Sequence, residues 1–344
     1  MKYILYCAIN NPILINETIY SLLSLSKTSH FRPDVRIIIL TNLTFPATVS
    51  CESWFKLQNR IIIETICNQS IIDRWTNNGA YRFNIKIEAI RFILDKYKGD
   101  VLFVDSDTIF LKDPTPLFDR IGYSRFALLY RYQSYRTLIK MPLYHNVVQK
   151  LVISQNRMRI RTYRYAIPLD YYHYNSGLIG ISYKNKELLE SVLTLSNCAL
   201  NELNLIVAEE LAFSCIFQKY GDIYSCDQYT FHYLYAKWAR FLIARYFGYY
   251  RANDLMEYQH FFSRHGVDIK NIPVSDFDRL PYLIHFIDSY LLKHKSISRD
   301  LLYLGGKDSF ADHILNDNQL FQRYIYLYEK NCMANRYPIM QNQK

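Results

Sequence analysis

The sequence predicts an α/β fold in which helices flank a mostly parallel central sheet. Over residues 1–115, short apolar runs alternate with runs whose apolar residues recur at helical spacing. One of the short runs, Val101–Val104, is apolar at every position, which is typical of a strand buried on both faces of a parallel sheet. Alternation of strands and helices connects parallel strands through right-handed crossovers. Together these observations predict the fold class.

The N-terminal elements follow from this alternation. Strands are expected at Tyr3–Ile9, Val35–Leu40 and Arg60–Ile66, where apolar and β-branched residues cluster. Helices are expected at Asn16–Ser26 and Phe83–Tyr97, where apolar residues share one face. The Val101–Val104 strand comes next in the chain.

The later elements are less regular. A short strand is expected in Asn175–Ile181, and a helix over Ala208–Tyr220, which Gly221 ends. The basic, tyrosine-rich segment Arg125–Tyr165 has no clean period and is expected to form a lid or an acceptor-binding region. The aromatic and basic segment Tyr233–Tyr250 is expected to be an amphipathic helix, lying either on the core or on an anionic membrane.

Composition limits the class of protein. The chain has 344 residues, 50% hydrophobic and 21% charged, and carries a net charge of +10 that suits an anionic partner. Its seven cysteines are scattered without a C-x-x-C pair, which indicates a reducing compartment. No apolar stretch approaches the roughly 20 residues of a membrane span. We therefore expect a cytoplasmic protein, at most peripheral to a membrane, with a main domain over 1–230 and a helical extension over 231–344.

The tripeptide Asp105-Ser106-Asp107 follows the apolar strand directly. In open α/β sheets ligands bind outside the carboxyl ends of the strands, and paired carboxylates there can hold a divalent cation against a phosphate. The helix before this strand runs antiparallel to it, so Arg82 and Lys86, four residues apart, are expected beside Asp105 and Asp107. The pattern predicts an enzyme that acts on a phosphorylated or nucleotide-linked substrate.

The ordered set of these motifs resembles the GT-A glycosyltransferases, particularly the glycosyltransferase family 8-like group. The resemblance covers about residues 3 to 290. The matching pieces are the first strand, the Arg82/Lys86 helix, Leu102–Asp107, Asp113-Pro114 with Leu117-Phe118, Tyr174–Gly177, the Glu209-Glu210 helix start and Leu283–Phe286.

The resemblance implies a Rossmann-like GT-A domain and a role for each matching residue. Asp105, Asp107 and His285 would hold Mn²⁺ or Mg²⁺, with His285 brought to the active site by a loop at about 281–294 of the extension. The nucleotide-sugar donor would be bound by Ala8, Asn10, Arg82, Lys86, Asp105 and Ser106. The catalytic residues beside the sugar would be Asp107, Asn175, Glu209 and Glu210.

The chain departs from the family at two of these places. In the His-x-x-Gly-x-x-Lys motif that begins at His285, Asp288 replaces Gly and Leu291 replaces Lys. The Glu209-Glu210 pair replaces the family's common Asp-Gln. A general base at Glu210 would imply inversion of the sugar's configuration, whereas the resemblance favours retention, so both outcomes stay open.

The implied function is a metal-dependent transfer of sugar from a nucleotide-diphosphate sugar, a UDP-sugar, to a hydroxyl of a glycan or glycolipid acceptor. One alternative is a haloacid dehalogenase-like phosphatase, because Asp105–Ile109 also fits its D-x-D-x-T loop and Asp222 or Asp227 could be its later acid. Another is a non-catalytic basic binding protein. A nucleic-acid partner is not expected, because the basic residues are spread along the chain.

Overall fold

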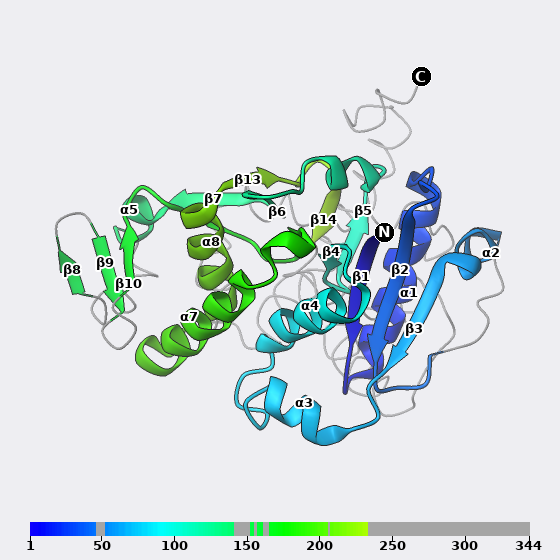
Figure 1. Cartoon of the computed structure of the whole chain (residues 1–344), viewed down its shortest axis with the longest axis horizontal. Coiled ribbons are helices and arrows are strands. Elements are labelled where there is room, and N and C mark those ends of the chain that lie inside the picture. The colour runs from blue at the N-terminus through cyan, green and yellow to red at the C-terminus, as the bar shows by residue number, and fades with distance from the viewer. Residues whose placement is uncertain (46–51, 141–151, 155–156, 161–164, 206, 233–344) are drawn as a thin grey trace, which may run out of the picture. The chain divides into compact units, whose positions relative to one another are not determined.

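The structure is a computed structural model, which describes residues 1–45, 52–140, 152–154, 157–160, 165–205 and 207–232 (Figure 1). The chain divides into two compact units, Met1–Thr230 and Phe231–Lys344. The expected segment Tyr233–Tyr250, the loop at 281–294 and the candidate ligand His285 lie outside the described residues.

A seven-stranded sheet forms the centre of the first unit, in the order β13-β6-β12-β4-β1-β2-β3. Strands β4, β1, β2 and β3 are parallel, and β13 is parallel to β6, whereas β12 is antiparallel to both β4 and β6. The expected α/β fold with a mostly parallel sheet is therefore confirmed. The strands are β1 (Lys2–Ala8), β2 (Val35–Thr41), β3 (Ile61–Thr65), β4 (Asp100–Val104), β6 (Arg125–Leu128), β12 (Leu178–Ile181) and β13 (Asp222–Ser225).

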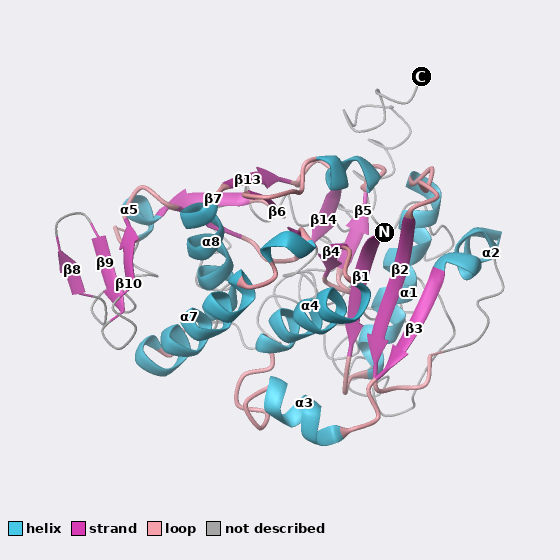
Figure 2. Ribbon diagram, in the orientation of Figure 1, coloured by secondary structure: helices cyan, strands magenta, loops and turns pink. Residues whose placement is uncertain are grey.

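Helices lie on both faces of this sheet (Figure 2). Side chains of β1 alternate between the faces, as a strand requires. On one face the Tyr6 hydroxyl lies 2.8 Å from the Ser21 hydroxyl of α1. On the other face Tyr3 and Leu5 join one hydrophobic core with Ile90 of α4 and with α7 and α8. The helices are α1 (Pro12–Thr28), α2 (Glu52–Leu57), α3 (Gln69–Trp75), α4 (Asn84–Tyr97), α5 (Tyr135–Leu138), α7 (Leu188–Leu203) and α8 (Ala208–Tyr220).

Three small sheets accompany the central one. Strands β7 and β11 pair, β8, β9 and β10 form a three-stranded sheet, and β14 pairs with β5. The segment Arg125–Tyr165, expected to be irregular, contains short strands in its described part. These strands are only three or four residues long, which is too short for an alternating pattern to be recognised in the sequence. Their bounds are β5 (Thr108–Phe110), β7 (Arg131–Ser134), β8 (Val152–Ser154), β9 (Arg157–Ile160), β10 (Tyr165–Pro168), β11 (Tyr172–Tyr174) and β14 (Thr230–His232).

The strand register places several predicted site residues at one edge of the sheet. Ala8, the last residue of β1, pairs with Thr41, the last residue of β2. Leu5 of β1 pairs with Phe103 of β4, so the chain leaves β4 after Val104 at this same edge. Within the described ranges, no helix is both long enough and apolar enough to span a bilayer.

Candidate functional site

A tight turn of three residues, Asp105–Asp107, connects β4 to β5 and is called the carboxylate loop below. The Asp105 backbone N–H donates to the Gly177 carbonyl at 2.8 Å, which attaches the loop to the segment before β12. Ser106 and Asp107 are each 7% exposed. A buried turn held at its backbone fixes where its carboxylates lie.

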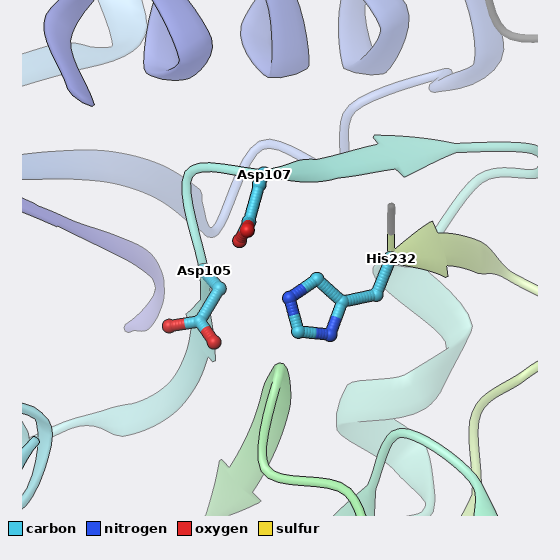
Figure 3. A group of neighbouring side chains, drawn as sticks. All are labelled: Asp105, Asp107 and His232. Atoms are coloured by element: carbon cyan, nitrogen blue, oxygen red, sulfur yellow. The ribbon is translucent and has the colours of Figure 1, made fainter. Parts of the chain in front are cut away.

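Asp105, Asp107 and His232 converge in front of this loop (Figure 3). Each offers a ligand atom, and these atoms all lie within 4.8 Å of one another. His232 ends β14, and the pairing of β14 with β5 brings it back to the loop from more than a hundred residues away along the chain. Carboxylate oxygens suit hard divalent cations, and an imidazole nitrogen is accepted by Mn²⁺ and other transition metals. The three side chains can therefore hold a divalent metal ion.

Lys86 lies in the first turn of α4 and reaches the carboxylate loop. Its Nζ donates to Asp105 Oδ2 at 2.8 Å and to Ser176 Oγ at 3.1 Å, and lies 3.4 Å from Glu209 Oε1. Burial opposes the charge of Lys86, but the carboxylates of Asp105 and Glu209 outweigh it and raise the pKa of Lys86 above its usual value. The ammonium group is thus a fixed positive charge beside the candidate metal site.

Arg82, expected to accompany Lys86, lies in the turn before α4 and is exposed. The helix begins at Asn84, so Arg82 stands outside its first turn. Its guanidinium carbon lies 5.3 Å from the centre of the Phe83 ring. The structure therefore brings Lys86 to the carboxylate loop and places Arg82 on the surface, stacked on its neighbour.

Glu209, at the start of α8, is buried in a network of hydroxyl and ammonium groups. The Tyr81 hydroxyl donates to its Oε2 at 2.7 Å, and the Ser176 hydroxyl donates to its Oε1 at 3.1 Å. Burial raises the pKa of Glu209, against the opposing effect of Lys86. The helix N-terminus also favours acidic side chains at this position.

Glu210, the next residue, is held by a different set of donors. Its Oε1 accepts from Asn175 Nδ2 at 2.8 Å and from the Ser176 backbone N–H at 3.5 Å, and its Oε2 lies 3.2 Å from His173 Nε2. Asn175 is fully buried. The predicted residues Asn175, Glu209 and Glu210 are therefore in one hydrogen-bonded network, which Lys86 links to Asp105.

Ala8 and Asn10 lie at the same edge of the sheet, at the end of β1. The Thr41 hydroxyl donates to the Ala8 carbonyl at 2.6 Å. Asn10 has a left-handed backbone, with φ of 58°, which asparagine tolerates better than most residues. Its backbone N–H donates to Asn42 Oδ1 at 2.8 Å, and Asn42 Nδ2 donates to Asn10 Oδ1 at 2.6 Å. The side chain of Asn10 is exposed at this edge.

The sequence patterns did not identify two candidate functional residues, His232 and His173. Thr230–His232 carries a weak strand pattern, but nothing in it indicates pairing with β5 or a place beside the carboxylate loop. His173 directly precedes the predicted Tyr174–Gly177 motif, and only the packing of β11 against α8 brings it to Glu210. Both residues reach the site through contacts between parts of the chain that are far apart in sequence, and no local pattern indicates such contacts.

The phosphatase alternative requires a later acidic residue near Asp105. Its candidates, Asp222 and Asp227, are exposed and belong to β13 and the turn after it. Strands β6 and β12 separate β13 from β4. At a strand spacing of about 4.8 Å, Asp222 on β13 is about 14 Å from β4, and Asp227 follows β13 in an exposed turn. The geometry therefore does not support the pairing that a phosphatase needs.

Comparison with known proteins gives only distant likenesses. No family model matches the sequence, and no curated protein matches it. Among solved structures, mouse xyloside xylosyltransferase 1 in its apo form is 12% identical with a TM-score of 0.42, over 66% of this chain and 86% of that one. Galactosyltransferase LgtC, in complex with donor and acceptor sugar analogs, is 13% identical with a TM-score of 0.40, over 65% of this chain and 73% of that one.

The glycosyltransferase GlyE of Streptococcus pneumoniae TIGR4 is 15% identical with a TM-score of 0.37, over 66% of this chain and 45% of that one. Likenesses at these identities and TM-scores are too distant to assign an activity to this chain. Its functional assignment therefore depends on the side chains described above.

Proposed function

We propose that this chain is a metal-dependent glycosyltransferase that moves a sugar from a nucleotide-diphosphate sugar, a UDP-sugar, to a hydroxyl group of a glycan or glycolipid. The observation that carries the proposal is the convergence of Asp105, Asp107 and His232 within 4.8 Å at the carboxyl edge of the sheet. The GT-A resemblance of the sequence motifs supports the same reaction. The donor, the acceptor and the metal are parts of the proposal.

The charges around the site are consistent with a diphosphate ligand. A divalent cation held by the three ligands would neutralise the negative charge that develops on the departing nucleoside diphosphate. Lys86 supplies a second positive charge, and its 2.8 Å contact with Asp105 keeps that charge at the carboxylate loop. Both lie at the edge of the sheet where α/β enzymes bind phosphorylated ligands.

The two glutamates take different roles in the proposal. Glu209 Oε1 lies 3.4 Å from the Lys86 ammonium, and its Oε2 accepts from the Tyr81 hydroxyl at 2.7 Å. We therefore assign Glu209 to hold Lys86 and Tyr81 in place. Glu210 and Asn175, whose side chains are bonded to each other at 2.8 Å, are assigned to border the donor sugar.

Thermal unfolding with a panel of nucleoside diphosphates tests the binding step. The panel comprises UDP, GDP, ADP and CDP, each with Mn²⁺, with Mg²⁺ and with a chelator. A ligand that binds only the folded protein stabilises it by about 2.7 kcal/mol at 100 times its dissociation constant. We expect a metal-dependent increase in Tm with UDP, which is lost in Asp107→Ala.

Asp95→Ala is the matched control for this experiment. Asp95 forms a 2.8 Å ion pair with Lys186, and its side chain is 53% exposed. It lies nine residues after Lys86 on α4, about 13 Å along the helix. The control should keep the UDP shift. Consumption of UDP-glucose, UDP-galactose or UDP-N-acetylglucosamine with Mn²⁺ then tests the chemical step. A protein that shows no shift with any nucleotide and consumes no donor would contradict the proposal.

A further inference from the structure

A buried chain of hydrogen bonds ends on Glu210. Cys215 Sγ lies 3.6 Å from the Tyr135 hydroxyl, which lies 3.3 Å from His173 Nδ1. On the other side of the imidazole ring, His173 Nε2 lies 3.2 Å from Glu210 Oε2. His173 and Tyr135 are 3% and 4% exposed, and Cys215 is fully buried. The chain thus connects α8, α5 and β11 out of contact with water.

An ionised Glu210 and a neutral His173 give one consistent set of proton positions along this chain. A carboxylate only accepts hydrogen bonds, so His173 Nε2 must carry the hydrogen that Glu210 accepts. In the neutral ring Nδ1 is then an acceptor, and the Tyr135 hydroxyl donates to it. The Cys215 thiol donates in turn to the oxygen of Tyr135. All three contacts are satisfied by one tautomer of His173, with the proton on Nε2.

Aromatic contacts fix the plane of the imidazole ring. The Tyr132 ring stacks on it at a centroid distance of 5.5 Å and an interplanar angle of 28°. The Tyr135 ring meets it edge-on, at 6.0 Å and 72°. A ring held on its face and at its edge has little freedom to turn, so Nε2 keeps its direction toward Glu210.

The other oxygen of Glu210 is turned toward the candidate active site. It accepts from Asn175 Nδ2 and from the Ser176 backbone N–H, and the Ser176 hydroxyl accepts from Lys86 beside Asp105. One oxygen of the Glu210 carboxylate is therefore held by His173, and the other is held by residues that contact the metal-site network.

We propose that His173 is a positioning residue, which orients the Glu210 carboxylate toward the donor sugar through its Nε2–H group. This role rests on the proposed glycosyltransferase function. It adds a residue outside the sequence motifs, since His173 touches neither the metal ligands nor Lys86 in the contacts described. For comparison, loss of a group that orients a metal ligand typically costs about 10- to 100-fold in metal affinity or activity.

Three substitutions separate this role from simple packing. His173→Leu removes both nitrogens and keeps a side chain of similar size, so we expect kcat to fall about 10- to 100-fold with little change in the donor KM. His173→Gln restores an amide N–H near the place of Nε2, so kcat should recover to within about 5-fold of the wild type. Tyr135→Phe removes the donor to Nδ1 but leaves the Nε2–H group that Glu210 accepts, so it should lower kcat by less than the leucine variant.

Tyr165→Phe is the matched control for Tyr135→Phe. The Tyr165 hydroxyl is also buried and donates to α8, to the Cys215 carbonyl at 3.3 Å, but it does not belong to the chain that ends on Glu210. Its removal should leave kcat unchanged. Activities are measured with the UDP-sugar that the wild-type protein consumes fastest in the presence of Mn²⁺, and Tm is measured for every variant.

The tautomer provides a readout that does not depend on activity. In two-dimensional ¹H–¹⁵N spectra of the full chain labelled at histidine, the signal that disappears in His173→Gln should show the neutral form protonated at Nε2. A signal protonated at Nδ1 alone would overturn the proposal, since Glu210 would then lose its donor.

The remaining outcomes are distinguishable. A wild-type protein that consumes a UDP-sugar while His173→Leu has the same kcat would overturn the role of His173 and leave the proposed function intact. Equal losses in the leucine and glutamine variants, accompanied by lowered Tm in both, would show a packing role and also overturn it. A wild-type protein that consumes no donor in the panel would overturn the proposed function, and this role with it.

Discussion

The ammonium group of Lys86 lies 2.8 Å from Asp105 Oδ2, so a buried ion pair connects helix α4 to the carboxylate loop. The same group lies 3.4 Å from Glu209 Oε1, and the side chains of Lys86 and Glu209 are 10% and 3% exposed. One cation thus offsets two carboxylates that come from different elements. The stability of this part of the fold should depend on that cation.

Lys86→Met should destabilise the protein by roughly 3–5 kcal/mol, because two carboxylates would be left without their cation in a buried place. The double variant Lys86→Met/Glu209→Gln should recover part of the loss, since one of the two charges is then removed. Urea unfolding at pH 7 measures both. Lys186→Met is the control: its 2.8 Å pair with Asp95 is exposed, and exposed pairs contribute little to stability. Equal losses in Lys86→Met and the control would contradict the prediction.

His232→Ala should weaken Mn²⁺ binding by about 10-fold or more, because the candidate site would lose one of three ligands. The comparison variant is His285→Ala, which removes the histidine that the sequence resemblance implied. Titration of Mn²⁺ by calorimetry, with and without UDP, distinguishes the two. Retention of the full affinity in His232→Ala with its loss in His285→Ala would assign the third ligand to His285 instead.

Local sequence signals predicted three of the described helices and five of the seven strands of the central sheet. The expected helix Ala208–Tyr220 coincides with α8, and the expected Phe83–Tyr97 differs from α4 by one residue. The first helix was placed four residues too late, although Asn11 caps α1 and Pro12 occupies its first position. Both are recognisable start signals. Helix α7 was not predicted, even though its buried residues recur at helical spacing.

The residues of the candidate site fall into two groups, those with a local sequence signal and those that long-range contacts bring to the site. Asp105 and Asp107 were predicted because they directly follow a buried strand, which is a local pattern. His232 and His173 reach the site only through strand pairing and helix packing over long sequence separations. The expected proximity of Arg82 to the carboxylates assumed that the helix includes it, whereas α4 begins two residues later. Long-range contacts and exact helix ends are what a single sequence does not specify.

Glu64 provides a prediction for the pH dependence of stability. Its carboxylate accepts from the Tyr97 hydroxyl and, at 2.6 Å, from Lys96 Nζ. Burial would raise the pKa of Glu64, but these two donors outweigh it and lower the pKa below the ordinary value of 4.5. A lowered pKa stabilises the fold above pH 4.5, and the contribution is lost as the pH falls through the pKa of the folded state.

Glu64→Gln should therefore cost about 1–2 kcal/mol at pH 7, and the difference from the wild type should shrink as the pH falls below 4.5. Urea unfolding at a series of pH values measures it. Glu190→Gln is the control, because Glu190 is 62% exposed in its pair with Arg91 and should contribute little at any pH. A wild-type advantage that is independent of pH would refute the assignment.

Gly221 joins α8 to β13 at a place with no room for a side chain. A Cβ atom there would lie 2.0 Å from the Ser124 carbonyl oxygen, which accepts a 3.0 Å hydrogen bond from the Asp222 backbone N–H. The φ of Gly221 is 170°, an extended conformation open to any residue, so the obstacle is steric. Relief of the clash requires movement of backbone, which weakens the pairing of β13 with β6.

Gly221→Ala should consequently destabilise the protein by about 2 kcal/mol or more, as judged by urea unfolding. Gly79→Ala is the matched control, since no atom lies within 4 Å of its added Cβ and its cost comes from a φ of +83° alone. That cost should be about 1 kcal/mol. A smaller loss at Gly221 than at Gly79 would show that β13 can shift away from Ser124 at little cost.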